Sequence, residues 1–133
     1  MQGPTNQRYL AIVNRVDFIA REQAGEQLHI DFLCRYCGIS ERTLRNAFRS
    51  IYKATPYRYL RERRMREVRE ALLHPKLTAT VTSIATEFGF VELGRFSVEY
   101  RSTFGECPSE TLRRSLAGIV SGRPNAPASP LTH

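Results

Sequence analysis

Lysine is nearly absent from this chain. Only Lys53 and Lys76 are lysines among 20 basic residues, so arginine supplies almost all of the formal net charge of +7. Arginine forms bidentate bonds with phosphate and guanine, whereas lysine acts as a point charge. The composition therefore favours nucleic acid as the partner. The alternative is a basic surface that carries no function.

Long apolar runs, a signal-peptide core and a disulfide framework are also missing. Charged residues interrupt every apolar stretch within a few positions, which argues against a membrane span. The first residues, MQGPTNQRYL, lack the apolar core of a signal peptide. Three cysteines, an odd number, suit a reducing compartment better than paired disulfides. We expect a cytoplasmic protein.

The chain shows no pattern typical of an enzyme or a metal site. It has no phosphate-binding glycine loop, and its histidines suggest no nucleophile–base–acid set. Cys34 and Cys37 form a C-x-x-C pair, but a structural zinc ion needs two more ligands. Packing in the core accounts for Cys34 without a metal ion, because Ala85 occupies the matching position in a repeat 51 residues later. We expect no catalytic residue, no metal and no cofactor.

A repeat of about 50 residues organises the sequence. Four residues recur 51 positions later: Leu33, Cys34, Gly38 and Ile39 match Ile84, Ala85, Gly89 and Phe90. Four more recur 52 positions later: Leu44, Phe48, Tyr52 and Pro56 match Phe96, Tyr100, Phe104 and Pro108. A repeat of this length indicates one supersecondary unit used twice. Each copy is typical of a helix, a glycine turn and a second helix, the order of a helix-turn-helix motif.

Helical spacing runs through the chain, and no segment alternates like a strand. We therefore predict an all-α fold of about seven helices, with two helix-turn-helix subdomains joined by a long central helix. Expected boundaries are a disordered N-terminus (1–6), a first subdomain (7–55), a linker helix (56–74), a second subdomain (75–116) and a disordered tail (117–133).

The helix predicted after Ser40 has two distinct faces. Leu44, Ala47, Phe48 and Ile51 form an apolar stripe that anchors it. Another face carries Arg42, Arg45, Asn46 and Arg49. Arginine can bind guanine bidentately in the major groove, and asparagine can do the same to adenine. We predict base contacts from Arg42, Arg45 and Asn46; an ordinary solvated face is the alternative.

The second copy has fewer polar side chains. At the matching positions it carries Gly94, Ser97, Val98 and Arg101. Arg95, Glu92 and Ser97 remain candidates for base or phosphate contacts, and Val98 can meet a thymine methyl. A motif that mainly packs and holds the DNA backbone explains this copy equally well.

The predicted helix from Pro56 to Leu73 would be about 27 Å long at 1.5 Å per residue. Such a helix can hold two recognition helices roughly one DNA turn, about 34 Å, apart. Its arginines add phosphate contacts or form a solvated face that the neighbouring glutamates neutralise. They are Arg58, Arg61, Arg63, Arg66 and Arg69.

Three segments resemble the DNA-binding domain of the AraC/XylS family over about residues 28–114. They are LCRYCGISERTLRNAF, TPYRYLRERRMREVREALL and IATEFGFVELGRFSVEYRSTFGECPSE. The resemblance implies a bacterial transcription regulator that binds promoter DNA at the nucleoid through two helix-turn-helix units and recruits RNA polymerase. It places base contacts at Arg42, Arg45 and Asn46 in the first unit, and at Leu93, Gly94, Arg95 and Val98 in the second. Positions that depart from the family pattern are Lys53, Val91, Val98 and Thr111.

We expect the strongest base specificity from the first unit, with affinity and register from the second. Phosphate contacts are expected from Ser40, Thr43, Arg49, Glu92, Ser97 and Arg101. The competing hypothesis is a helical interaction module whose basic face docks an acidic protein. The 133 residues contain no sensory domain, so they form a short regulator or part of a longer one, and we expect them to be monomeric alone.

Overall fold

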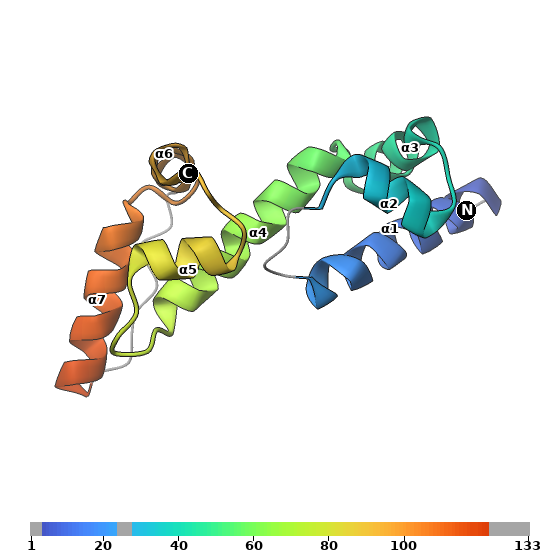
Figure 1. Cartoon of the computed structure of the whole chain (residues 1–133). Helices are drawn as coiled ribbons and strands as arrows, with labels where there is room; N and C mark the ends of the chain where they lie inside the picture. The colour runs from blue at the N-terminus through green and yellow to red at the C-terminus, as the bar shows by residue number, and fades with distance from the viewer. Residues whose placement is uncertain (1–3, 24–27, 123–133) are drawn as a thin grey trace. The chain divides into compact units, whose positions relative to one another are not determined.

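The computed structural model describes residues 4–23 and 28–122, and over these ranges all regular secondary structure is helical (Figure 1). The helices are α1 (Pro4–Glu22), α2 (Ile30–Cys37), α3 (Glu41–Tyr52), α4 (Pro56–Leu73), α5 (Val81–Glu87), α6 (Leu93–Phe104) and α7 (Pro108–Ser121). They divide into unit 1, which ends at Arg63, and unit 2, which begins at Arg64. Seven helices without strands in the described residues confirm the all-α prediction.

Unit 1 consists of α1, α2, α3 and the first part of α4. Its core is built from residues of all four helices, and α1 packs mainly against α3. The buried members are Ile12, Val13, Val16, Ile19, Ala20, Leu33, Leu44, Ala47, Phe48 and Leu60. The apolar stripe predicted for α3 therefore faces this core, with Ile51 packed at its margin.

Local signals set the ends of the helices in unit 1. Gly38 follows α2 in the left-handed conformation, with φ 68°, which glycine adopts without a steric penalty. Ser40 caps α3, since its hydroxyl accepts a hydrogen bond from the Thr43 amide. Thr55 accepts from the Arg58 amide in the same way, and Pro56 occupies the first position of α4. The glycine turn at Gly38 and the helix start after Ser40 agree with the predictions from the sequence.

Unit 2 repeats the design with the second part of α4 and helices α5, α6 and α7. Its buried core residues are Met65, Val68, Leu72, Ile84, Ala85, Phe90, Phe96, Tyr100 and Leu112. Thr80 and Ser83 form a reciprocal capping box at the start of α5.

Burial shows that the repeat extends to the first helix of each unit. In α1, the buried residues include Ile12, Val13, Val16 and Ala20. A shift of 52 positions leads to Arg64, Met65, Val68 and Leu72 in α4, which are buried as well. The second part of α4 therefore plays in unit 2 the role that α1 plays in unit 1.

The structure moves several expected boundaries. α1 begins at Pro4, inside the N-terminal segment expected to be disordered, and α7 continues to Ser121, five residues beyond the expected end of the second subdomain. The helix expected to be a separate linker is shared, because Leu60 lies in one core and Met65 in the other. The remaining parts of the expected disordered ends, residues 1–3 and 123–133, lie outside the described residues.

Candidate nucleic-acid interface

The face of α3 opposite its buried stripe carries the polar side chains predicted from the sequence. Arg42 and Arg49 are exposed, whereas Arg45 and Asn46 are half-buried. The Arg45 guanidinium lies 2.6 Å from the Glu41 carboxylate, one turn earlier in the helix. The side chains of Arg45 and Glu41 are 44% and 56% exposed, so solvent weakens this pair and it contributes little to stability. It holds Arg45 along the helix surface and leaves its guanidinium accessible to a ligand.

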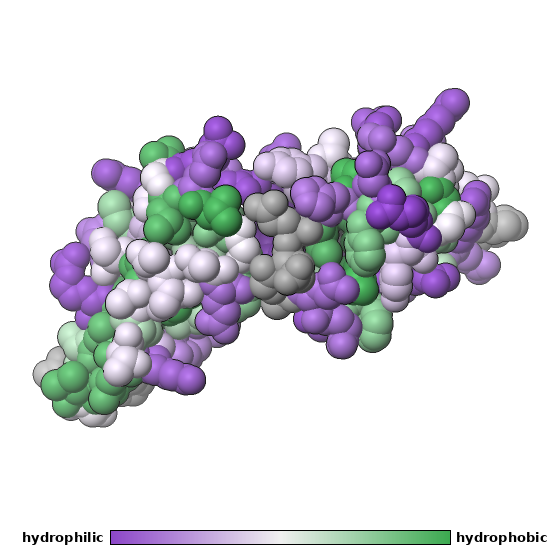
Figure 2. Space-filling view, viewed as in Figure 1, coloured by the Kyte–Doolittle hydropathy of each residue, from purple (hydrophilic) through white to green (hydrophobic). Residues whose placement is uncertain are grey.

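The start of α3 presents two hydroxyls. The Ser40 Oγ donates to Thr43 Oγ1 at 3.1 Å and accepts from the Thr43 amide at the same distance. A helix N-terminus carries partial positive charge and free amide groups, which suit a phosphate. The predicted phosphate contacts at Ser40 and Thr43 thus lie beside the predicted base contacts on one helix. Figure 2 shows hydrophilic side chains projecting over α3.

α6 is anchored like α3 but carries a different outer face. Phe96 and Tyr100 are fully buried, and the opposite face consists of Gly94, Val98 and Arg101, with Arg95 beside them. A Cβ atom added at Gly94 would meet no atom within 4 Å. The Arg95 Nε lies 3.8 Å from the Glu92 carboxylate, an exposed and loose pair. Polar and apolar side chains are mixed over α6 in Figure 2.

Three further predicted residues of the second unit lie at the margins of this face. Glu92, predicted as a phosphate contact, is the N-cap residue of α6, and its side chain forms no capping hydrogen bond. Leu93 is half-buried and packs against the core of unit 2, so only part of its side chain can meet a base. Ser97 is also half-buried.

A half-buried carboxylate of α1 binds side chains of α3 and α4 in unit 1. Asp17 of α1 accepts hydrogen bonds from the hydroxyls of Tyr52 at 3.0 Å and Tyr59 at 2.8 Å, and from Arg63 at 2.9 Å. The two tyrosine rings stack with centroids 4.2 Å apart. Burial, followed by hydrogen bonds to Tyr59 and Asp17, raises the pKa of Tyr52 above its ordinary value. We call these four residues the Asp17 cluster.

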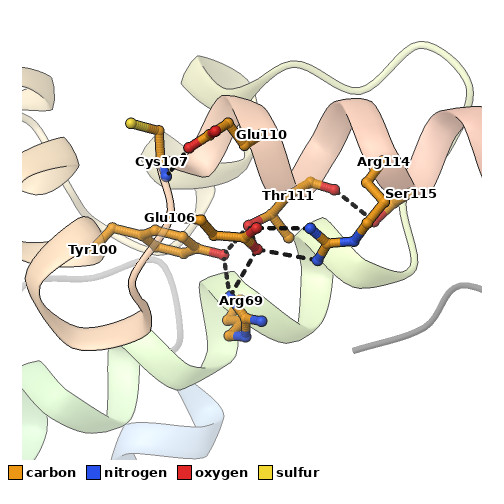
Figure 3. Close-up of polar contacts among 8 residues, drawn as sticks. All are labelled: Arg69, Tyr100, Glu106, Cys107, Glu110, Thr111, Arg114 and Ser115. Carbon is orange, nitrogen blue, oxygen red and sulfur yellow. Dashed lines mark hydrogen bonds and ion pairs between the residues drawn. The ribbon is translucent and has the colours of Figure 1, made fainter. Parts of the chain in front are cut away.

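A second half-buried carboxylate lies at the centre of the contacts drawn in Figure 3. Glu106, in the α6–α7 connection, binds Arg114 through both oxygens at 2.7 and 3.1 Å, accepts from Thr111, and pairs with Arg69 at 3.4 Å. The Arg69 guanidinium also donates to the Tyr100 hydroxyl at 3.0 Å. Hydrogen bonds from Arg114 lower the pKa of Glu106 to about 2, although burial opposes this. These five residues form the Glu106 cluster.

The two clusters correct the expectation for the arginines of α4. Side chains of Arg63 and Arg69 are only 16% and 15% exposed, because each is bound to a carboxylate within its own unit. They are therefore neither phosphate contacts nor part of a solvated face. Arg58, paired with Glu62 at 3.1 Å, and Arg66 remain exposed.

Sequence reasoning missed Asp17, Glu106 and Tyr100 as positioning residues. Asp17 directly follows the buried Val16. A carboxylate at the edge of an apolar stripe was therefore the signal in the sequence that could have identified Asp17. Glu106 offered no comparable signal, since it lies in a turn between two helices. Its partners Arg69 and Arg114 are separated from it by 37 and 8 positions.

The described residues contain no group of three or more histidines, cysteines or acids that could hold a metal ion. Burial is the main cause that raises the pKa of both Cys34 and Cys37, which keeps these thiols protonated. Within the same residues, no helix is long and apolar enough to cross a membrane.

Comparisons with known proteins agree with this geometry. A family model described as a helix-turn-helix domain matches residues 33–114. The chain is 34% identical over 115 residues to XylDLEGF operon transcriptional activator 2 of Pseudomonas putida, covering 86% of this chain and 73% of that protein. It is 38% identical over 100 residues to a XylDLEGF operon transcriptional activator of the same organism, covering 74% of this chain but only 31% of that protein.

A solved structure supports the same assignment. A probable AraC family transcriptional regulator from Rhodopseudomonas palustris matches with a TM-score of 0.71 and 31% identity, over 79% of this chain and 97% of that chain. The AraC-type regulator from Chromobacterium violaceum has the same TM-score at 24% identity, over 80% of this chain and 93% of that chain, and supports the fold. These similarities favour DNA binding over a protein-docking module. The chain belongs to the AraC/XylS family of helix-turn-helix transcription regulators, which are DNA-binding proteins and not enzymes.

Proposed function

We propose that this chain binds specific sequences of double-stranded promoter DNA by inserting α3 and α6 into two successive major grooves. The observation that carries the proposal is the shared construction of these helices. Each has one face buried in its own core and an opposite face that carries basic side chains. A rigidly supported helix with accessible donors on its outer face fits the major groove.

The proposed contacts divide by chemistry. Base edges are met by Arg42, Arg45 and Asn46 of α3, and by Leu93, Gly94, Arg95 and Val98 of α6. Phosphates are met by Ser40, Thr43 and Arg49 in unit 1, and by Glu92, Ser97 and Arg101 in unit 2. Glu92 can act only through its backbone amide, because its carboxylate repels phosphate. Unit 1 has more bidentate donors, so we assign it the larger share of base discrimination.

The relatives suggest a role for the bound complex. Several are named as transcriptional activators of operons, and we extend this role to the present chain as an activator that contacts RNA polymerase. We further propose that this chain binds DNA as a monomer, because each unit supplies its own recognition helix. Its place of action is the nucleoid in the bacterial cytoplasm.

Selection of binding sites from a random duplex pool tests the proposal. The 133-residue chain is incubated with the pool, bound duplexes are sequenced, and affinity for the selected and random duplexes is measured at several salt concentrations. We expect tighter binding to the selected duplex by about 1,000-fold or more and a steep loss of affinity with salt. Equal affinity for all duplexes would refute sequence-specific binding.

A further inference from the structure

α3 and α6 place chemically different residues at equivalent positions of their outer faces. A shift of 52 residues relates Arg42 to Gly94 and Asn46 to Val98. The residues that anchor the two helices, Leu44 and Phe48 against Phe96 and Tyr100, are all fully buried. Position 98 therefore lies in the middle of the face that α6 turns away from its core.

Val98 is 70% exposed, so its two methyl groups are accessible on the outer face of α6. The residue one turn earlier is Gly94, which has no side chain that could cover Val98. The space around the Gly94 Cα is open. The exposed Arg95 lies one turn away at its side, at i−3. The α6 backbone can thus approach a surface closely at this point, with an apolar group at the contact.

The major groove offers one apolar group to such a side chain. Its base edges display hydrogen-bond donors and acceptors, apart from the 5-methyl group of thymine. A valine cannot satisfy a donor or acceptor, so placing it against the polar atoms of a base edge leaves those atoms unsatisfied and desolvated. The methyl group gains from removal of water instead.

We infer that unit 2 selects a thymine through contact between the Val98 methyl groups and the thymine 5-methyl group, adjacent to a guanine bound by Arg95. This inference rests on the proposed function, in which α6 enters a major groove. It gives the two units different chemical preferences. Unit 1 discriminates bases through hydrogen bonds from Arg42 and Asn46, and unit 2 through one apolar contact and one arginine.

Removal of a single methyl group from the DNA provides the test. In the selected duplex, the half-site of unit 2 is the one whose preference is lost when selection is repeated with Arg95→Ala. Each thymine in that half-site is then replaced singly by deoxyuridine. We expect one replacement to weaken binding of the wild-type chain about fourfold, the value of one buried methyl group.

The same duplexes are then measured with Val98→Ala. We expect this variant to bind the thymine duplex more weakly and to be insensitive to the deoxyuridine replacement, because the two changes remove the same contact. Val120→Ala is the matched control, since Val120 is 80% exposed on α7, and it should keep the full response to deoxyuridine. Both substitutions are at exposed positions, and far-ultraviolet circular dichroism checks that the helices persist.

The outcomes separate the inference from the proposed function. Two results would overturn the inference and leave specific DNA binding intact. One is specific binding to a duplex that has no thymine in the half-site of unit 2. The other is that the losses of affinity from Val98→Ala and from deoxyuridine multiply. Equal binding to selected and random duplexes would overturn the proposed function, and the inference with it.

Discussion

Unit 1 and unit 2 place opposite charges at the same position of their first helices. Asp17 in α1 and Arg69 in α4 are 52 residues apart, and both form hydrogen bonds behind the recognition helix of their own unit. Tyr59, which donates to Asp17, corresponds to Thr111, which donates to Glu106. Each unit therefore has a charged residue at this position of its first helix. The carboxylate itself lies on a helix in unit 1 and in a turn in unit 2.

The outer faces differ more than the cores. Large apolar or aromatic residues fill the same positions behind α3 and α6, because close packing tolerates few changes in volume. Packing sets no such limit on side-chain volume at the outer faces, where Arg42 and Asn46 of α3 correspond to Gly94 and Val98 of α6. The frame of the motif and its recognition chemistry have therefore diverged to different extents.

Removing either half-buried carboxylate should have the largest effect. We expect Asp17→Asn to lower the free energy of unfolding by about 3 kcal/mol, because a neutral amide replaces the carboxylate that accepts hydrogen bonds from Tyr52, Tyr59 and Arg63. Glu106→Gln should cost a similar amount in unit 2. Urea denaturation followed by circular dichroism measures both.

Glu62→Gln is the matched control for these variants, since it removes an exposed ion pair with Arg58. It should change the free energy of unfolding by less than about 0.5 kcal/mol. If Asp17→Asn is as mild as this control, the Asp17 cluster does not anchor unit 1.

Low pH should destabilise unit 2, because it protonates the Glu106 carboxylate. The folded pKa of about 2 lies below the ordinary value of 4.5, so the folded state gains stability from the ionised form. This contribution is complete above about pH 5 and disappears as the pH falls toward 2. We expect a loss of about 3 kcal/mol over this interval, since a shift of one pKa unit corresponds to about 1.4 kcal/mol.

Urea denaturation at a series of pH values from about 5 to about 2 gives the slope. The Glu106→Gln variant should lose this part of the pH dependence, because glutamine does not titrate. An unchanged slope in that variant would show that other carboxylates cause the acid sensitivity.

DNA binding should reveal the asymmetry between the recognition helices. We expect Arg45→Ala to weaken binding to the selected duplex by about 2 kcal/mol, since it removes a bidentate contact to a base. Arg95→Ala should cost less, because unit 1 carries more of the base discrimination. Affinities of both variants are measured side by side, and a greater loss for Arg95→Ala would reverse the proposed order.

The residues that end the two recognition helices should show the smallest effect. Lys53 adopts φ 58° and Gly105, its equivalent, φ 79°. A lysine is strained in this left-handed conformation, whereas a glycine is not. We expect Lys53→Gly to raise the free energy of unfolding by about 0.5 kcal/mol, after the greater entropy of an unfolded glycine is deducted.

The reciprocal change provides the control for this variant. Gly105→Lys should destabilise unit 2 by about 1 kcal/mol for the same steric reason. Thermal unfolding of both variants is sufficient. A loss of stability in Lys53→Gly would mean that the contact from Lys53 Nζ to the Ser50 carbonyl, at 3.1 Å, outweighs the strain.

Most helices and caps could be predicted from the sequence. The helix predicted after Ser40 and the helix predicted from Pro56 to Leu73 agree with α3 and α4 of the structure. The ends of the chain were harder to place. Disorder was expected up to residue 6 and from residue 117, but α1 begins at Pro4 and α7 continues to Ser121, where Gly122 ends it in the left-handed conformation.

Parts of the candidate site needed the structure. Leu93, which we propose as a base contact, also packs against its own core, because position 93 lies beside the buried Phe96 and Tyr100 on the helix surface. Arg63 and Arg69 looked equivalent to their exposed neighbours in a sequence rich in arginine. Burial of their side chains depends on Asp17 and Glu106, which are 46 and 37 residues away.

Sequence alone determined the repeat, the helices and the arginine-rich outer face of α3, since each depends on residues within a few turns of one another or on a fixed spacing. Tertiary structure decided which charged residues remain in solvent and which bind each other inside a unit. The physical reason is that a charge leaves water only when a distant partner replaces its hydration, and the chain order does not disclose where that partner lies.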